Sequence, residues 1–237
     1  MPLTIGFQVG LRRRPLRELW VRTGPPLRLD RTGWLLTAAM LVLPAVRLVQ
    51  SLAAGQWAGA GWMVACMVGA VAAASALRRF QRADAREWLR WIATAGVTGI
   101  ALMSISIVPA VIAAGWPADP AAMLVTALEA VLLYIPVQFV LEEVAFRGLL
   151  DTHVSERPAR RQWPSALVVS VVWALWHLPI AETGGVPMGL VLVQLLLLHC
   201  AVGVPLSFGW RRTGNLAVPA IAHALINAVR NALLVGL

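Results

Sequence analysis

Three short motifs in the C-terminal half of the chain combine side chains that could together hydrolyse a bond. They read EEVAFR at 142–147, WALWH at 173–177 and HALIN at 223–227. A carboxylate such as Glu142 can take a proton from water, and an imidazole such as His177 can orient that water, carry a proton or bind a metal. His223 and Asn227 share a helix face at i and i+4, and imidazole and amide N–H groups can donate to a developing oxyanion. These four residues are the candidate catalytic set.

Helical spacing predicts supporting roles for the residues around that set. Glu143 and Arg147 stand at i and i+4, so they can pair on one face of a helix. Glu142 is rotated by about 100° from Glu143 on an α-helix, so its carboxylate can face another direction. Trp173 precedes His177 by one turn and can pack beside its ring. We therefore expect Glu143, Arg147 and Trp173 to support the site.

Composition indicates the environment in which these motifs must fold. Of the 237 residues, 59% are hydrophobic and only 13% are charged, whereas about a quarter of the residues of a soluble domain are charged. A helix needs roughly 20 apolar residues to cross a bilayer, and helices satisfy their own backbone hydrogen bonds in lipid. Seven apolar segments approach this length, at 34–54, 57–77, 91–114, 121–147, 164–181, 188–209 and 215–236. The sequence predicts an all-α, polytopic transmembrane helix bundle of about seven spans.

The arginines predict how the bundle is oriented. Arginines are abundant in the N-terminal arm and in the loops after the second, fourth and sixth segments, and they are absent from the alternate loops. The positive-inside rule then places the N-terminus in the cytoplasm. The basic excess is explained by topology, so we expect no nucleic-acid partner. The chain divides into a basic cytoplasmic arm at 1–33, N-terminal spans at 34–114 and a catalytic helix bundle at 115–237. Within the arm, we expect the stretch Leu11 to Arg31, with its seven arginines, to be surface-lying or disordered.

Charged residues inside a span cost roughly 2.5–3.5 kcal/mol each on insertion scales, yet the three motifs lie within apolar segments. With straight helices entering from the cytoplasm, Glu142, His177 and His223 lie roughly 16, 18 and 12 Å deep, so the motifs can meet. Other polar residues of the chain have simpler explanations. We expect His199 to bond between helices, His153 to be solvated, and Arg230 to reach towards the membrane surface or pair between helices. Arg47 has no evident partner, Glu129 falls near the outer boundary, and Cys66 and Cys200 suggest buried free thiols rather than a disulfide or zinc site.

The three motifs resemble those of the CPBP family, the CAAX-protease and bacteriocin-processing intramembrane proteases, which include the type 2 CAAX prenyl endopeptidases. The family pattern is EExxxR, then an aromatic residue one turn before a histidine, then HxxxN. The resemblance covers roughly residues 121–237 and does not extend to the first three spans. The second motif of the family often begins with phenylalanine, and Trp173 stands in that place here.

The resemblance implies a role for each matching residue. Glu142 would be the general base that activates water, and His177 would position that water. His223 and Asn227 would stabilise the oxyanion, while the neighbouring carboxylate–guanidinium pair would support the site. The family has been described both as glutamic and as metal-dependent, and both readings stay open here. Glu142, His177 and His223 are also the residue types of a catalytic zinc site with one open position, although the chain has no HExxH.

The sequence therefore predicts an intramembrane endopeptidase that cuts a membrane-associated or lipidated peptide or protein with Glu-activated water. Arginine-rich loops without lysine suggest a GC-rich genome, so we expect a bacterial plasma membrane, with the active-site cavity facing the cytoplasm. No cofactor is certain, and zinc is the candidate metal. One alternative is a non-catalytic immunity or scaffold protein on the same fold. The other is a small proton-coupled transporter, because buried Glu and His residues also mark proton relays.

Overall fold

The computed structural model describes residues 2–22, 29–81, 84–115, 119–155, 162–181 and 185–235. Within those ranges the chain is helical, and its extended pairing is limited to one isolated bridge between Val21 and Asn215. The elements in chain order are α1 (Pro2–Gly6), η1 (Phe7–Leu11), η2 (Leu16–Leu19), α2 (Arg31–Ala53), α3 (Trp57–Leu77), α4 (Ala85–Ala113), α5 (Pro120–Gln138), η4 (Phe139–Asp151), α6 (Thr152–Ser155), α7 (Gln162–His177), η6 (Leu178–Ile180), α8 (Met188–Thr213) and α9 (Ala217–Leu233). The prediction of a polytopic helix bundle is confirmed.

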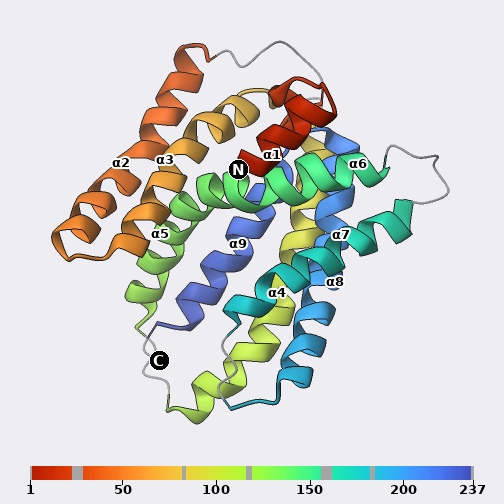
Figure 1. Ribbon diagram of the computed structural model, residues 1–237. Coiled ribbons are helices and arrows are strands. Elements are labelled where there is room, and N and C mark those ends of the chain that lie inside the picture. Colours follow the sequence, from red (N-terminus) through yellow and green to blue (C-terminus); the bar gives the residue numbers. More distant parts are fainter. Residues whose placement is uncertain are drawn as a thin grey trace.

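Within the described ranges, six helices are long and apolar enough to cross a membrane: α2, α3, α4, the continuous helix Pro120–Ser155, the helix Gln162–Ile180, and α8. The seventh predicted segment forms α9, which has 17 residues. This helix packs against both α5 and α4, and Figure 1 shows it inside the bundle. Most of its residues are buried, so α9 can present polar groups to the interior rather than to lipid.

Three arginine-bearing segments lie at one end of the bundle. Figure 1 shows the N-terminal arm, the α3–α4 connection and the α8–α9 turn at the top, whereas α4 ends and α8 begins at the bottom and the α2–α3 turn lies at the left, at the lower end of the hairpin. This separation agrees with the alternation of arginine along the chain, and the cytoplasmic side remains a prediction. The arginine-free loops 115–120 and 182–187 fall partly outside the described residues, and the arginine-bearing loop after α6 falls wholly outside them.

At the arginine-bearing end, Asp30 ties the two helices of the N-terminal hairpin together. Its carboxylate accepts the Gly33 N–H at the start of α2 and pairs with Arg78, which directly follows α3. The hydrogen bond from Arg78, and then the bond from Gly33, lower the pKa of Asp30 to about 2. The pair therefore remains charged across the physiological pH range.

The N-terminal arm is part of the fold over residues 2–22, which corrects the expectation of a surface-lying or disordered arm. Leu19 is fully buried, and the Arg22 N–H donates to the carbonyl of Gly214 in the α8–α9 turn. A Cβ added at Gly148 would lie 1.9 Å from the carbonyl oxygen of Leu19, so the arm packs directly on the helix that carries the first motif. The apolar positions of the arm, hidden among its arginines, explain why it folds back.

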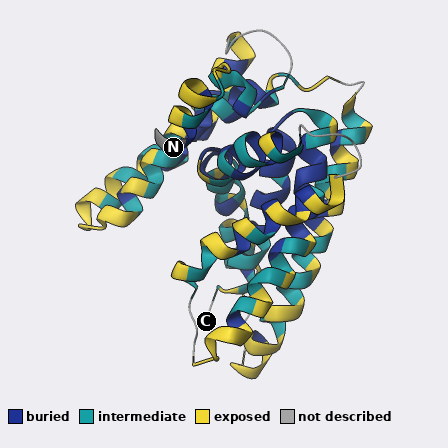
Figure 2. Cartoon of the chain, turned by 45° about the vertical axis from the view of Figure 1, so that its right-hand side comes forward, coloured by how far each residue is buried: buried dark blue, intermediate teal, exposed yellow. Residues whose placement is uncertain are grey.

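In the N-terminal hairpin, α2 packs on the bundle more loosely than the other helices that could span a membrane, whereas α3 is closely packed against it. Few residues of α2 are buried, and Figure 2 shows exposed positions along much of the hairpin while the centre of the bundle is dark blue. Inside the spans, Arg47 of α2 forms an ion pair with Glu129 of α5. The sequence did not predict this partner, and the pair ties the hairpin to the remaining helices.

The helix that carries the first motif is neither straight nor wholly α-helical, which corrects the geometry used for the depth estimate. Residues Phe139–Asp151 wind as a π-helix between α5 and α6, and in Figure 1 the chain bends after α5 and runs across the bundle towards α6. Pro136 stands just before the bend, and proline is a common cause of helix kinks. The rise per residue along a straight helix therefore does not give the depth of Glu142 in the membrane. Side-chain contacts show whether the three motifs lie close together.

Candidate active site

Glu142 is the carboxylate that faces the histidines. One of its oxygens, Oε2, accepts a hydrogen bond from the indole Nε1–H of Trp173 at 2.7 Å. The same oxygen lies 3.7 Å from Nε2 of His177, and both side chains stay partly exposed, at 16% for Glu142 and 24% for His177. The predicted proximity of Glu142 to the second motif is therefore present in the structure.

Glu143 has a closed environment on the same helix. Its side chain and that of Arg147 are both 0% exposed, with Arg147 Nε 3.5 Å from Glu143 Oε2. The other oxygen of Glu143 lies 2.9 Å from Nδ1 of His223. The guanidinium of Arg147 also lies over the ring of Trp173, 4.2 Å from its centre. The adjacent glutamates thus differ as their spacing suggests, one pointing to the cavity and one enclosed by charge partners.

The local packing explains how a charged group can be buried so completely beside α8. A Cβ added at Gly203 of α8 would lie 2.5 Å from Oγ of Ser170 and 3.2 Å from Nη2 of Arg147. Small residues allow helices in membranes to approach closely. The close approach of α7 and α8 encloses Arg147, and the π-helical winding of η4 is a feature frequently found at functional sites.

Three imidazoles are oriented in the same way. Nδ1 of His177 bonds to the Trp173 carbonyl at 2.9 Å, and Nδ1 of His199 bonds to the Leu195 carbonyl at 2.8 Å. A carbonyl only accepts, so each Nδ1 carries a proton, and in the neutral ring each Nε2 is left as an acceptor. Nδ1 of His223 is likewise engaged, by a carboxylate. All three rings are therefore held by one nitrogen and present the other.

These rings line one cavity of about 170 Å³. Trp173, His177, His223 and Asn227 all contribute to its wall, and Glu142 meets this group through its contacts with the tryptophan and the histidine of α7. The amide of Asn227 is 7% exposed, lines the cavity and makes no side-chain hydrogen bond within the described residues. The structure thus brings the second and third motifs to one cavity and places Glu142 beside it.

His199 is a member of this site that sequence reasoning missed. Its ring centre lies 4.4 Å from that of His177 and 4.5 Å from that of Trp173, and it lines the same cavity. In the sequence it is a single histidine within LLLLHC, with no second polar residue at helical spacing. The one feature of the sequence that could have pointed to His199 is its place inside a span, where an ionisable residue indicates a functional site by default. His153, by contrast, is exposed as expected and touches the edge of Phe7.

A metal would need its ligands gathered around one point. Among the residues that the structure describes, no group of three His, Cys, Asp or Glu side chains is placed to hold a metal ion. Glu142 and His177 are neighbours, but Nδ1 of His223 is turned to Glu143. The three side chains do not form a zinc site in this arrangement, and the zinc hypothesis stays a prediction.

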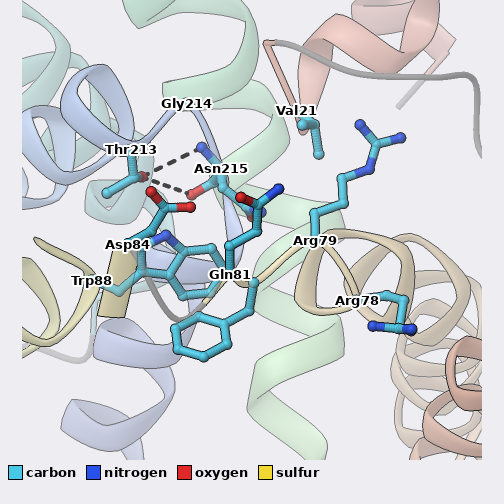
Figure 3. A pocket seen from close by; sticks show the side chains of 10 residues that line it. Val21, Arg78, Arg79, Gln81, Asp84, Trp88, Thr213, Gly214 and Asn215 are labelled. Carbon is cyan, nitrogen blue, oxygen red and sulfur yellow. Dashed lines mark hydrogen bonds between the residues drawn. The ribbon is translucent and has the colours of Figure 1, made fainter. Parts of the chain in front are cut away.

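A larger cavity, of about 510 Å³, lies away from these groups at the arginine-bearing end. Figure 3 shows side chains from the arm, the α3–α4 connection and the α8–α9 turn around it. Asn215 in its wall is already engaged, because its amide donates to the Ala76 carbonyl and accepts from the Ala217 N–H. The lining contains no histidine and no residue of the three motifs, so the smaller cavity is the candidate active site.

Residues 124–229 match the sequence family described as type II CAAX prenyl endopeptidase Rce1-like. This part of the chain is similar to the Rce1-like family. The match covers a little under half of the chain and includes all three motifs, which confirms the family resemblance. It supports a membrane protease of the CAAX type in general, with a peptide or protein substrate. A search of curated proteins and a search of solved structures each found no significant match. The Rce1-like region leaves α2, α3 and α4 outside.

Proposed function

We propose that this Rce1-like protein is an intramembrane endopeptidase in which Glu142 activates a water molecule to cleave a membrane-associated peptide. The observation that carries the proposal is the difference between the two adjacent carboxylates. Glu143 is enclosed by Arg147 and His223, whereas Glu142 stays partly exposed beside His177. A general base needs an accessible carboxylate, and Glu142 meets this requirement.

The contacts of Glu142 support a definite position for the water. Trp173 holds Oε2, which leaves Oε1 as an acceptor, and His177 presents Nε2 as a second acceptor. A water molecule has two O–H donors and can satisfy both. Glu142 takes one proton, the oxygen attacks the carbonyl carbon, and the electrons of the C=O bond move to the carbonyl oxygen. When the C–N bond breaks, Glu142 returns the proton to the leaving amine, so that water is consumed and an acid and an amine are released.

The negative oxygen that forms in this step needs donors. The Asn227 amide lines the cavity, has no side-chain hydrogen bond to another described residue, and can donate its N–H. His223 can donate from Nε2 when both of its nitrogens carry protons, and Glu143 balances that positive charge at 2.9 Å. Fixed donors in a site shielded from water stabilise such charge strongly. We propose that the substrate reaches them from the cytoplasmic side of the membrane.

The test compares Glu142→Gln with Glu143→Gln in detergent-purified protein. Termini of membrane proteins that change on gene deletion would identify a substrate peptide, whose cleavage is then measured by mass spectrometry. We expect Glu142→Gln to lower the cleavage rate by about 10²–10⁴-fold with a melting temperature near that of the wild type. Glu143→Gln should lower the amount of folded protein, while the molecules that do fold retain activity. A folded, inactive Glu143→Gln beside a fully active Glu142→Gln would reverse the assignment.

Metal dependence is tested in the same assay. The glutamic mechanism predicts that metal-stripped protein still cleaves its peptide. Stoichiometric zinc in the purified protein, together with activity lost on chelation and restored by zinc, would instead establish a metalloprotease. No observation on the described residues favours the alternative of a transporter or that of a scaffold protein.

A further inference from the structure

A groove at the arginine-bearing end of the bundle has no part in the mechanism above. It has a volume of about 450 Å³ and lies where α8 packs against α4 and α7 (Figure 1). Its lining comes from the N-terminal part of α4, the start of α7 and the C-terminal part of α8, and consists of Glu87, Arg90, Trp91, Thr94, Trp163, Val204, Pro205, Phe208 and Arg212. We call it the α4–α8 groove. It shares no residue with the candidate active-site cavity.

Three aromatic rings, one from each helix, form a wall of the groove. The rings of Trp91 and Phe208 are stacked, with centres 5.9 Å apart and an angle of 13° between their planes. The ring of Trp163 lies 4.9 Å from that of Phe208, and the Trp163 side chain is exposed. Arg211 of α8 donates to the carbonyl of Gln162, which holds the start of α7 against α8. The wall is therefore set by contacts between the helices.

Two guanidinium groups share this groove with one carboxylate. Arg212 is exposed in the last turn of α8, and no carboxylate among the described residues lies within ion-pair distance of it. The side chain of Arg90 is 67% exposed, and its contact with Glu87 is long, at 4.0 Å. Glu87 also accepts the indole N–H of Trp91 at 2.6 Å. Two cations against one engaged anion give the groove a net positive charge.

The lining changes from apolar to charged along α8. Val204, Phe208 and Arg212 follow one another at intervals of four residues, so they share one face of the helix. Val204 and Phe208 are buried, whereas Arg212 is exposed about 12 Å further along the helix. A phospholipid in a bilayer has the same order, with its chains in the apolar core and its phosphate at the surface. The groove therefore matches an amphiphile better than a free polar molecule.

We propose that the α4–α8 groove binds one anionic phospholipid, with its phosphate on Arg90 and Arg212 and its acyl chains against Trp163. A guanidinium has paired N–H donors that suit phosphate oxygens, and basic pockets between transmembrane helices bind anionic head groups. The positive-inside rule explains why arginines lie at this end, and the C-terminal end of a helix favours a cation. Neither effect requires two arginines to line one aromatic-walled groove.

The proposed lipid lies along the same three helices as the active-site cavity. That cavity is lined by Met103 of α4, Trp173 of α7 and Val202 of α8, among others. Met103 follows Thr94 of the groove by nine residues, a rise of about 14 Å. The head group is therefore separate from the catalytic side chains, and its binding can be measured without a peptide substrate.

The experiment titrates the full chain in detergent with dioleoylphosphatidylglycerol or dioleoylphosphatidylcholine and counts bound lipid by native mass spectrometry. The two lipids have the same chains and a phosphate, but only the first carries a net negative charge. The groove variant combines Arg90→Gln with Arg212→Gln. The matched control combines Arg31→Gln with Arg86→Gln, which removes two exposed arginines at the starts of α2 and α4 that do not line the groove. Melting temperatures report whether each variant is folded.

We expect the wild type to bind one phosphatidylglycerol about tenfold more tightly than phosphatidylcholine, because each arginine near a lipid phosphate contributes to the attraction. The groove variant should lose this preference, and the control variant should keep it. If the double groove variant does not fold, Arg90→Gln and Arg212→Gln are measured singly, and each should lower the preference by about threefold. Inorganic phosphate should not displace the lipid, because it has no chains to contact the aromatic wall.

Three results would overturn the proposal. Equal binding of both lipids by the wild type would make any bound molecule an ordinary boundary lipid. Equal losses in the groove and control variants would indicate attraction to the whole basic end. Displacement of the lipid by inorganic phosphate at similar concentrations would identify the ligand as a free anion. Because no peptide is cleaved in this assay, each result is independent of the proposed protease function.

Discussion

Two of the groups of charged side chains within the described helices are built differently. The hairpin pair, Arg47 and Glu129, joins α2 to α5 with side chains that are 40% and 37% exposed. In the active-site group, Glu143 and Arg147 are both 0% exposed, and they adjoin the partly open Glu142. The comparison teaches that an ion pair between two helices can join them, whereas chemistry requires a carboxylate that stays accessible.

The energetics of the two groups should differ for the same reason. A buried charge that loses its partner is strongly destabilising, by about 3–5 kcal/mol. Half-exposed pairs contribute far less, about 0–1 kcal/mol, and polar contacts between helices in membranes average about 0.6 kcal/mol. Similar ionic chemistry is therefore expected to have consequences of different size in the two regions.

The largest expected effect is on the enclosed pair. Arg147→Ala leaves the Glu143 carboxylate buried without its cation, so we expect a loss of about 3–5 kcal/mol of stability, seen as a sharp fall in folded protein and in the melting temperature in detergent. Arg86→Ala, an exposed position at the start of α4, is the control. Equal melting temperatures for the two variants would remove the distinction between the groups.

Trp173 tests the open side of the active-site group. Trp173→Phe keeps an aromatic ring under Arg147 but removes the N–H that holds Glu142 Oε2. A hydrogen bond to a charged group contributes about 1.5–3 kcal/mol, so we expect cleavage to slow by about tenfold or more while the protein melts within a few degrees of the wild type. Full activity would mean that the indole N–H does not position the base.

A pair of glycines compares the packing of the two regions. Gly203→Ala would press against Ser170 and Arg147, and we expect it to destabilise the protein by about 1–3 kcal/mol. Gly61 in α3 has no atom within 4 Å of an added Cβ, so Gly61→Ala should stabilise by about 0.5–1 kcal/mol. Thermal melts of both variants in one detergent check the opposite signs.

The smallest expected effect belongs to the hairpin pair. Arg47→Gln, Glu129→Gln and the double variant form a cycle whose coupling energy should be about 0.6 kcal/mol, with cleavage within about twofold of the wild type. Melting curves give the coupling energy, and peptide cleavage gives the activity of each variant. A coupling of several kcal/mol, or loss of activity, would show that the hairpin takes part in the site.

Much of the fold was predictable because lipid makes strict demands on a sequence. Apolar runs of span length and alternating arginines predicted the bundle and its two ends, since backbone groups in lipid must be satisfied within helices. The amphipathic arm was misjudged because its arginines conceal the few residues, such as Leu19, that become buried. The contact of the arm with Gly148 depends on the shape of a helix that is far away in the sequence, and a local sequence pattern does not predict such a contact.

The motifs predicted the division between the adjacent glutamates, because residue type and helical spacing decide which neighbours on one helix can pair, and the chemistry that they indicate stays a prediction. Only the tertiary structure decided what reaches the site from other helices. Folding brought His199 against His177, turned His223 towards Glu143, and gave Arg47 its partner in Glu129. Helix spacing relates residues within a few turns, whereas these contacts depend on how α7, α8 and α9 cross, on the bend after α5, and on the π-helical winding of η4.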